Sequence, residues 1–341
     1  MKSGFVSIIG RPNVGKSTLL NTILKKKVSI VSPKAQTTRN SIQGIYNSDD
    51  SQIIFIDNPG VHKPNSELST FMNKSAFSSL RDVEAMLIMV DASVEFGEGD
   101  KFLLDKIKDV KIPSFIVLNK IDQSNLLLVD NLKKQYKEVF PNSKVIEISA
   151  LNDVNVDLLL ENIIAVLPEG PQYFPQDVIT DHPETFIVSE IIREKILGLL
   201  HEEVPHSIAV IVEKMKQTKN VCEIYATIIC EREGQKGIII GKGGKMIKRI
   251  GMQARYDIAP YIKAKELRAK GSTVGHLSDK DLKELFVLVS PNADFRNKFD
   301  SILAEIIENR CEIESLTKQR DELLPLLMNG QASVNYHLSA Y

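Results

Sequence analysis

The chain contains no tryptophan and only three cysteines, Cys222, Cys230 and Cys311, whose spacing does not match a metal site. It also lacks an apolar stretch long enough to span a bilayer. Met1 to Gly4 lead directly into an apolar run, which leaves no room for a signal peptide. These absences predict a soluble cytoplasmic protein whose thiols are reduced.

A net charge of one sign is also absent, because 43 Lys and Arg are balanced by 44 Asp and Glu, for a formal net charge of −1. No overall field can therefore attract nucleic acid, and any such binding requires a local basic patch. The length of 341 residues, with 43% hydrophobic and 26% charged residues, indicates an ordinary globular protein of two or three domains.

Short apolar runs alternate with amphipathic stretches from residue 5 to about residue 167. This alternation predicts an α/β fold with a mainly parallel sheet that helices cover on both faces. Ligands in such folds bind at the carboxyl ends of the strands. The predicted strands are 5–9, 51–56, 85–90, 114–118 and 144–148, and the predicted helices are 68–80, 100–108, 129–140 and 156–167.

The octapeptide Gly-Arg-Pro-Asn-Val-Gly-Lys-Ser at 10–17 follows the first strand and precedes a helix, as a phosphate-binding loop does. Its backbone N–H groups can surround phosphate oxygens, while Lys16 adds positive charge and the Ser17 hydroxyl can ligate Mg²⁺. We expect Lys16 to act in catalysis as well. The expected phosphate-binding residues are Gly10, Asn13, Val14, Gly15, Lys16, Ser17 and Thr18.

Two further segments are expected beside the phosphates. Asp57 and Gly60 follow the strand at 51–56, where the carboxylate can hold the Mg²⁺ shell, directly or through water, and the Gly60 N–H can contact a γ-phosphate. The polar loop 36–39, Gln-Thr-Thr-Arg, can close on the metal and the γ-phosphate. Each segment alone is also compatible with an ordinary turn.

A base-binding motif, Asn119-Lys120-Ile-Asp122, follows the strand at 114–118. The Asp122 carboxylate can accept hydrogen bonds from the ring N–H and the amine of guanine, whereas adenine presents the wrong edge. After the next strand, a backbone N–H at Ser149 or Ala150 can donate to the guanine carbonyl. These motifs in this order predict a guanine-nucleotide switch that binds GTP and GDP.

The second half of the chain begins with a proline-containing linker at 169–183. A helix is predicted at 184–200, two strands at 207–214 and 223–232, and a further strand at 238–240 before Gly-Lys-Gly-Gly at 241–244. An amphipathic helix is predicted next, with Ile247, Ile250, Ala254 and Ile258 on one face.

This order, with glycines before a helix, is the KH arrangement, in which a single-stranded backbone approaches the helix N-terminus. A glycine-rich turn can also simply permit tight packing, but the basic cluster around it favours RNA binding. The expected RNA-binding residues are Arg232, Lys236, Gly241, Lys242, Gly243, Gly244, Lys245, Lys248 and Arg249.

Six segments together resemble the Era family of ribosome-assembly GTPases: 10–17, 34–39, 59–60, 119–122, 189–195 and 231–236. The resemblance implies GTP hydrolysis with Mg²⁺ and a KH domain that grips the three-prime end of small-subunit ribosomal RNA during assembly of the small subunit. It also implies peripheral contact with the inner face of the cell membrane. It favours Thr38 over Thr37 as the metal-facing threonine, with Thr37 as the alternative, and Asn58 stands where the family usually has threonine.

Val61 follows Gly60 at the position where Ras-like switches carry a glutamine that orients water. An aliphatic side chain cannot hydrogen-bond a nucleophile, so we expect slow intrinsic hydrolysis. Relatives with such a residue are thought to use a monovalent cation held by the loop asparagine. We therefore hypothesise that Asn13 helps to bind K⁺, which would supply positive charge at the phosphates.

The family resemblance covers residues 3–262 and then ends. The tail, 263–341, resembles the C-terminal end of a type I restriction-modification specificity subunit, and apolar residues at three- and four-residue steps predict a coiled-coil-like helix at 294–324. Such a helix would drive self-association or dock on the KH face. These apolar residues are Phe299, Ile302, Ile306, Ile313, Leu316, Leu323 and Leu327.

The break removes the family's final KH strand, and the run at 285–289 is a candidate replacement. Without it the sheet would keep two strands and an exposed edge, which is marginal for stability. The expected domains are therefore 1–168 for nucleotide, 184–262 for RNA, and the tail. Two alternatives remain from the sequence: an RNA- or DNA-binding adaptor with a vestigial GTPase, and a defective fusion product with an impaired KH segment.

Overall fold

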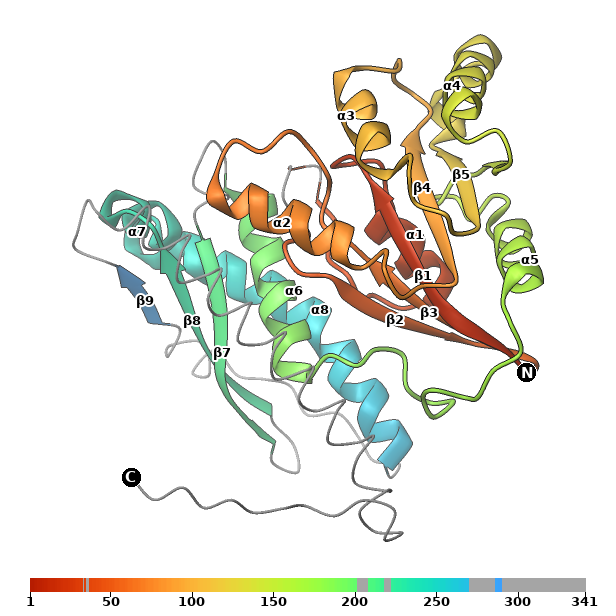
Figure 1. Ribbon diagram of the computed structural model, residues 1–341. Coiled ribbons are helices and arrows are strands. Elements are labelled where there is room, and N and C mark those ends of the chain that lie inside the picture. Colours follow the sequence, from red (N-terminus) through yellow and green to blue (C-terminus); the bar gives the residue numbers. More distant parts are fainter. Residues whose placement is uncertain (33, 35–36, 201–207, 218–221, 270–285, 290–341) are drawn as a thin grey trace, which may run out of the picture. The chain divides into compact units, whose positions relative to one another are not determined.

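The computed structural model describes residues 1–32, 34, 37–200, 208–217, 222–269 and 286–289 (Figure 1). The tail residues at 290–341, with the predicted helix at 294–324, lie outside the described residues, as does Gln36. No helix in the described part of the chain is both long and apolar enough to cross a membrane.

The first half of the chain forms one six-stranded sheet with the order β2-β3-β1-β4-β5-β6 (Figure 1). Every neighbouring pair is parallel except β2 and β3, which are antiparallel. The strands are β1 (Lys2–Gly10), β2 (Ile42–Asn47), β3 (Ser51–Asp57), β4 (Ala85–Asp91), β5 (Ser114–Asn119) and β6 (Lys144–Glu147). The predicted α/β fold with a mainly parallel sheet is confirmed.

Helices cover both faces of this sheet because alternate strand residues point to opposite faces. Ile8 and its neighbours pack under α1 (Lys16–Leu24) and α5 (Val156–Val166). Ile9 packs on the other face, in a cluster that includes side chains of α2 (Glu67–Ser78), α3 (Glu98–Ile107) and α4 (Leu126–Val139). Two separate apolar layers therefore hold the carboxyl ends of the strands in place.

The elements predicted between residues 51 and 167 are all present, with ends that differ by at most three residues. The largest difference is at α4, where the Asn125 side chain accepts a hydrogen bond from the Leu128 N–H at 3.0 Å and so begins the helix. Leu126 and Leu127 in its first turn are exposed, so the amphipathic pattern starts later than the helix. The edge strand β2 was not predicted.

The linker at 169–183 bonds to the edge strand β2 and to Gln52 of the neighbouring strand β3. Figure 1 shows it running from α5 to α6 (Glu184–Leu199). The Gln52 amide oxygen accepts from the Tyr173 N–H at 2.7 Å and the Phe174 N–H at 3.0 Å. The Ile45 N–H on β2 donates to the Ile179 carbonyl at 2.9 Å. The linker is thus bonded to the nucleotide-binding part of the chain and covers part of an otherwise open sheet edge.

The second half forms a smaller α+β unit around a sheet with the order β7-β8-β9. β7 (Ile208–Gln217) and β8 (Cys222–Cys230) are antiparallel, and β9 (Phe286–Val289) joins β8 in parallel register. The candidate strand at 285–289 therefore completes a three-stranded sheet, and the two-stranded alternative is wrong. The helices are α6 (Glu184–Leu199), α7 (Glu233–Ile240) and α8 (Lys245–Ala269).

The prediction of a strand at 238–240 is also wrong, because these residues end helix α7. The Gln235 side chain accepts a hydrogen bond from the Arg232 N–H at 3.0 Å, which begins the helix. Gln235 and Ile239, four residues apart, are buried while Ile238 is exposed, which is helical spacing. The β-branched run favoured a strand locally, and the cap and the packing of one face outweigh it.

Helix α8 has the predicted apolar face. Ile250, Ala254 and Ile258 are buried in the cluster that includes side chains of α6, β7 and β8, and Ile247 packs against it. Met252 lies on the same helix but is 53% exposed. Burial thus follows the helical period, as the sequence indicates.

Replacing Ile250 by Ala should destabilise the second half of the chain by about 2–5 kcal/mol, because it leaves a cavity in a fully buried cluster. Urea unfolding followed by a probe in this half measures the change. The matched control Met252→Ala on the same helix should change stability by less than about 0.5 kcal/mol. Equal effects of the two substitutions would contradict the described packing of α8.

Candidate functional site

A cavity of about 400 Å³ opens at the carboxyl ends of β1 and β3. Most of the residues predicted to contact phosphate contribute to its lining, together with residues of the loop between α1 and β2. The lining residues are Pro12, Asn13, Gly15, Lys16, Ser17, Thr18, Ile30, Val31, Ser32, Thr37, Thr38, Gly60 and Lys120. Gly10 and Val14 belong to the same loop but do not line the cavity.

The phosphate loop needs glycine at position 15. Gly15 has a φ of +97°, and a Cβ atom there would lie 2.3 Å from the Asn119 side-chain nitrogen. That nitrogen donates to the Val14 carbonyl at 2.8 Å. Close approach at Gly15 therefore lets the base-binding motif hold the phosphate loop directly.

Lys16 is 6% exposed at the start of α1, and its ammonium donates to the Arg11 carbonyl at 2.9 Å and the Gly10 carbonyl at 3.2 Å. Burial lowers the pKa of Lys16 to about 8, although the nearby Asp57 carboxylate opposes this shift. Burial also raises the pKa of Asp57, against the opposing effects of Lys16 and of hydrogen bonds from Ser17 and Ser29. Anionic oxygens of a ligand would stabilise the buried Lys16 ammonium, and a cation would stabilise the buried Asp57 carboxylate. The site therefore favours a ligand that brings both.

The residues predicted to face the metal lie together. The Ser17 hydroxyl donates to Asp57 Oδ2 at 2.6 Å and lies 3.0 Å from Thr38 Oγ1. Thr37 instead donates its hydroxyl to the Lys34 carbonyl at 2.6 Å, so Thr38 and not Thr37 faces Ser17. Asp57 Oδ1 is buried without a hydrogen-bond partner among the described residues. Hydroxyl and carboxylate oxygens with a spare lone pair are suitable ligands for Mg²⁺, so this donor set fits the ion.

The base-binding residues form a second group at the ends of β5 and β6. The Asn119 oxygen accepts from the Ala150 N–H at 2.9 Å, while its nitrogen holds the phosphate loop. The Ser149 hydroxyl donates to Asp122 Oδ1 at 2.5 Å, and this hydrogen bond lowers the pKa of Asp122. Asp122 is therefore ionised near neutral pH and available as an acceptor, as recognition of guanine requires.

Around Gly60 the backbone is fixed by neighbours. The Val61 N–H donates to the Gly10 carbonyl at 3.0 Å, and the Val61 side chain is fully buried in the core. His62 Nδ1 lies 3.1 Å from the Gly60 carbonyl. Asn58 bonds to Ser7, at 2.8 Å, and accepts from Ser41, so it ties β1 to β3 instead of facing the cavity.

Two residues of this site, Ser29 and Asp91, carry no motif that would identify them from the sequence. Ser29 follows α1 and donates to Asp57 Oδ2 at 2.9 Å. Asp91, at the end of β4, accepts from the Lys120 ammonium at 2.5 Å and so positions a predicted base-binding residue. The sequence pattern does place Asp91 at the carboxyl end of a parallel strand. That position is the one signal in the sequence that could have identified it.

The predicted RNA-binding residues surround the turn between α7 and α8. Gly241, Gly243 and Gly244 have φ values of +73°, +61° and +75°, which side chains other than glycine rarely adopt. The exposed basic residues there are Arg232, Lys242, Lys245, Lys248 and Arg249, and Lys236 is half-buried.

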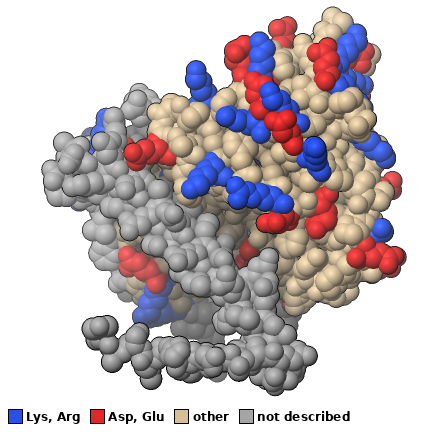
Figure 2. All heavy atoms as spheres, in the orientation of Figure 1, with Lys and Arg blue, Asp and Glu red and all other residues tan. Residues whose placement is uncertain are grey.

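On the face that Figure 2 shows, acidic and basic side chains are mixed over the nucleotide-binding half, without a large area of one sign. The net charge of −1 agrees with this mixing. Attraction of a polyanion would therefore depend on the local cluster beside Gly241–Gly244.

Two family models match the chain. Residues 5–120 match the 50S ribosome-binding GTPase family, and residues 203–266 match the KH domain. GTPase Era from Clostridium kluyveri is 51% identical over 289 residues, which cover 84% of this chain and 99% of the relative. GTPase Era from Alkaliphilus metalliredigens is 48% identical over 299 residues, covering 87% of this chain and 96% of the relative.

Two solved structures are similar over most of the chain. A crystal structure of Era with MgGDPNP and nucleotides 1506–1542 of 16S ribosomal RNA has a TM-score of 0.76 and 38% identity, covering 88% of this chain and 97% of that one. A variant of Aquifex aeolicus Era bound to GDP and AlF4⁻ has a TM-score of 0.75 and 37% identity, covering 87% of this chain and 98% of that one.

Nucleotide affinity should depend on the protonation of Lys16. Its pKa of about 8 in the free protein should rise when phosphate binds, because anionic oxygens favour the ammonium. At a pH between the pKa of Lys16 in the free protein and its higher pKa in the GDP complex, Lys16 takes up a proton when GDP binds. Because protons become scarcer as pH rises, affinity for GDP should fall by up to about tenfold per pH unit above about pH 8.

Calorimetric titration of GDP, in two buffers of different ionisation enthalpy, measures this proton uptake. We expect close to one proton at about pH 9.5 and close to none at about pH 7. In the control Lys16→Arg the guanidinium stays charged throughout, so its affinity, whatever its value, should lose this pH dependence. Absence of proton uptake by the unsubstituted chain at high pH would refute the assignment.

Proposed function

The chain belongs to the Era family of GTPases, and we propose that it couples Mg²⁺-dependent GTP hydrolysis to binding of the three-prime end of small-subunit ribosomal RNA during assembly of the small subunit. One observation carries the nucleotide part of this proposal. Asn119 bonds both to Val14 in the phosphate loop and to Ala150 in the guanine loop, so the groups for triphosphate and for guanine are held next to each other.

The proposed roles follow the geometry of the cavity. Ser17, Thr38 and Asp57 would hold Mg²⁺, and the phosphate loop would hold the phosphates through its backbone N–H groups. Asp122 would bind the guanine ring N–H and amine, while the Ala150 or Ser149 N–H would donate to the guanine carbonyl. Lys120, held by Asp91, would pack beside the base.

Hydrolysis requires in-line attack of water on the γ-phosphate with charge stabilised on the phosphate oxygens. Lys16, buried at the start of α1, would stabilise that charge, and the Gly60 N–H would donate to the γ-phosphate. Thr38 would close the loop over the site and exclude bulk water. When bound, Mg²⁺ would draw electron density from the phosphate oxygens.

K⁺ is proposed as a second cation, held with the help of Asn13. This proposal rests on Val61, whose fully buried aliphatic side chain cannot orient water, so the site lacks the glutamine of Ras-like switches. Asn13 lines the cavity and has a φ of +63°, a conformation that asparagine tolerates better than most residues. A cation beside it would act on the phosphates as an arginine finger does.

The RNA part of the proposal uses the basic cluster beside Gly241–Gly244. Its support is the glycine turn, the exposed lysines around it and the three-stranded sheet that β9 completes. The third strand supports a complete KH sheet over the alternative of an impaired one. The proposed domains are 1–168, the linker 169–183 and a KH unit that begins at 184 and includes β9 beyond the expected boundary at 262.

Three further proposals rest on the sequence alone. They are peripheral contact with the inner face of the membrane, self-association through 294–324, and the likeness of the tail to a type I specificity subunit. The expectation that the family resemblance ends at residue 262 is wrong, because matches of 289 and 299 residues, which cover 99% and 96% of the relatives, are longer than the segment 3–262. About 13–16% of the chain remains unmatched.

If the KH cluster binds RNA, replacing Lys242, Lys245 and Lys248 together by Ala should weaken binding of an RNA with the sequence of 16S nucleotides 1506–1542. The slope of log affinity against log salt should become shallower by about 0.7 for each lost phosphate contact. Fluorescence anisotropy at several salt concentrations measures both effects.

The control for this experiment replaces three exposed lysines of the nucleotide-binding half, Lys74, Lys111 and Lys134, by Ala. This variant also loses three positive charges, but the slope of log affinity for RNA against log salt should stay unchanged. Affinity of the unsubstituted chain should also differ by about fivefold or more between GDP and a non-hydrolysable GTP analogue. Equal slopes for both triple variants, or equal affinities in both nucleotides, would contradict the proposal.

If Asn13 helps to hold K⁺, GTP turnover should be about tenfold or more faster in KCl than in NaCl of equal ionic strength, because a bound cation stabilises the developing charge. Asn13→Ala should turn over equally in both salts. Affinity for GDP in the two salts serves as the control and should not differ. Equal turnover of the unsubstituted chain in the two salts would eliminate K⁺ from the reaction.

A further inference from the structure

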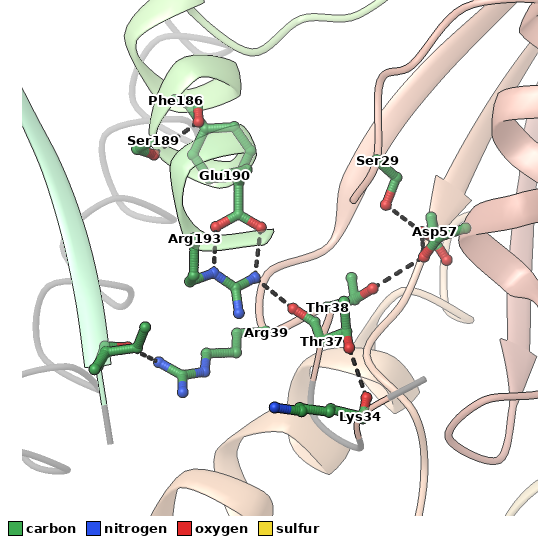
Figure 3. Close-up of polar contacts among 12 residues, drawn as sticks. Ser29, Lys34, Thr37, Thr38, Arg39, Asp57, Phe186, Ser189, Glu190 and Arg193 are labelled. Carbon is green, nitrogen blue, oxygen red and sulfur yellow. Dashed lines mark hydrogen bonds and ion pairs between the residues drawn. The ribbon is translucent and has the colours of Figure 1, made fainter. Parts of the chain in front are cut away.

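A buried ion pair on α6 extends from the KH half of the chain to the loop that carries Thr38 (Figure 3). The Arg193 guanidinium, on a residue that is 3% exposed, donates to the two carboxylate oxygens of Glu190 at 2.7 and 2.6 Å. The nitrogen that bonds to Glu190 Oε2 also donates to the Thr37 carbonyl. One guanidinium thus joins a KH helix to the nucleotide site.

Burial makes this contact sensitive to the position of the loop. Glu190 neutralises the charge of Arg193, but a buried guanidinium also needs partners for its N–H groups. Its other terminal nitrogen, Nη1, has no hydrogen-bond partner among the described residues. If the Thr37 carbonyl moved away, the buried Arg193 guanidinium would have still fewer hydrogen-bond acceptors. The contact therefore favours the present position of the loop that carries Thr37 and Thr38.

The carbonyl that Arg193 holds belongs to the peptide bond directly before Thr38. Because that peptide unit is planar, fixing the Thr37 oxygen restricts the position of Thr38. Thr38 Oγ1 lies 3.0 Å from Ser17 Oγ, at the edge proposed for the metal. The contact therefore acts on a group that only a triphosphate with Mg²⁺ would need.

The KH half holds the same loop at two further points. Lys34 donates its ammonium to the Leu200 carbonyl just after α6, and Arg39 Nη1 donates to the Ile208 carbonyl on β7 at 2.7 Å. The two contacts lie on either side of Thr37 in the sequence. Closure of the loop and docking of the KH half are therefore geometrically linked.

We propose that Arg193, whose positive charge is compensated by Glu190, is a positioning residue for the GTPase site, which holds Thr37 so that Thr38 reaches the metal and γ-phosphate. This inference rests on the proposed function, because it requires Thr38 to act only when the γ-phosphate is present. By linkage, the γ-phosphate that orders Thr38 strengthens the contact with α6, so nucleotide state and KH docking bias each other.

The test replaces both members of the pair, Glu190→Gln with Arg193→Gln, so that no buried charge is left unpaired. Glutamine at 193 is too short to bridge to Thr37. Affinity for a non-hydrolysable GTP analogue should fall about tenfold while affinity for GDP stays unchanged. The Mg²⁺ concentration for half-maximal GTP turnover should rise by a similar factor.

Lys27→Ala is the matched control, since Lys27 bonds Glu194 of α6 and Asp257 of α8, at 2.8 and 2.7 Å, without touching the Thr37–Thr38 peptide. It should leave the GTP-to-GDP affinity ratio unchanged. Arg193→Lys keeps the charge pair with Glu190, but its single nitrogen cannot bond to Glu190 and Thr37 as the guanidinium does. It should therefore also lower affinity for the GTP analogue relative to GDP. This variant provides the test if the double variant does not fold.

An unchanged GTP-to-GDP ratio and Mg²⁺ dependence in these variants would overturn the proposal. Equal losses for both nucleotides would overturn it too, since they indicate a general loss of structure. Failure of the underlying function is distinguishable, because then the unsubstituted chain itself would show no Mg²⁺-dependent turnover of GTP.

Discussion

The loop at residues 37–39 contacts both the nucleotide site and the KH half of the chain. The way these two halves are connected depends on this double contact. Thr38 lies beside Ser17 at the edge proposed for the metal, while the Thr37 carbonyl and the Arg39 side chain bond to the KH half. Three consecutive residues cannot move independently, because a peptide chain has only two soft dihedrals per residue. Under our proposal, a change at the γ-phosphate would therefore reach α6 without a long pathway of intermediate contacts.

The charges of the nucleotide site make this constraint responsive to ligand. Lys16 and Asp57 are both buried, and burial disfavours the charged form of each. In the proposed function, phosphate and a divalent cation would bring partners for these charges, so binding would reduce the cost of burying them. The neutral Glu190–Arg193 pair behaves differently, because its charges compensate each other and its contact with Thr37 depends on geometry alone.

Much of the nucleotide half could be predicted from the sequence, because strand ends, glycine turns and polar motifs coincide there. The KH half was less predictable. The run at 238–240 favours a strand by its side chains, yet the cap at Arg232 and the buried face of α7 decide for a helix. Arg193 could not be assigned from the sequence either, since a basic residue on an amphipathic helix is usually solvated. Its partner lies 156 positions away, and only the fold brings the two together.

The most direct test of this account is the distance between the two halves of the chain in each nucleotide state. Spin labels at Lys134→Cys on α4 and Met252→Cys on α8, both exposed positions, report it by pulsed electron resonance once the native cysteines are replaced. The account predicts one narrow distance distribution with Mg²⁺ and a non-hydrolysable GTP analogue, and a broader or shifted one with GDP. Identical distributions in the two nucleotides would contradict the claim that one loop serves both sites.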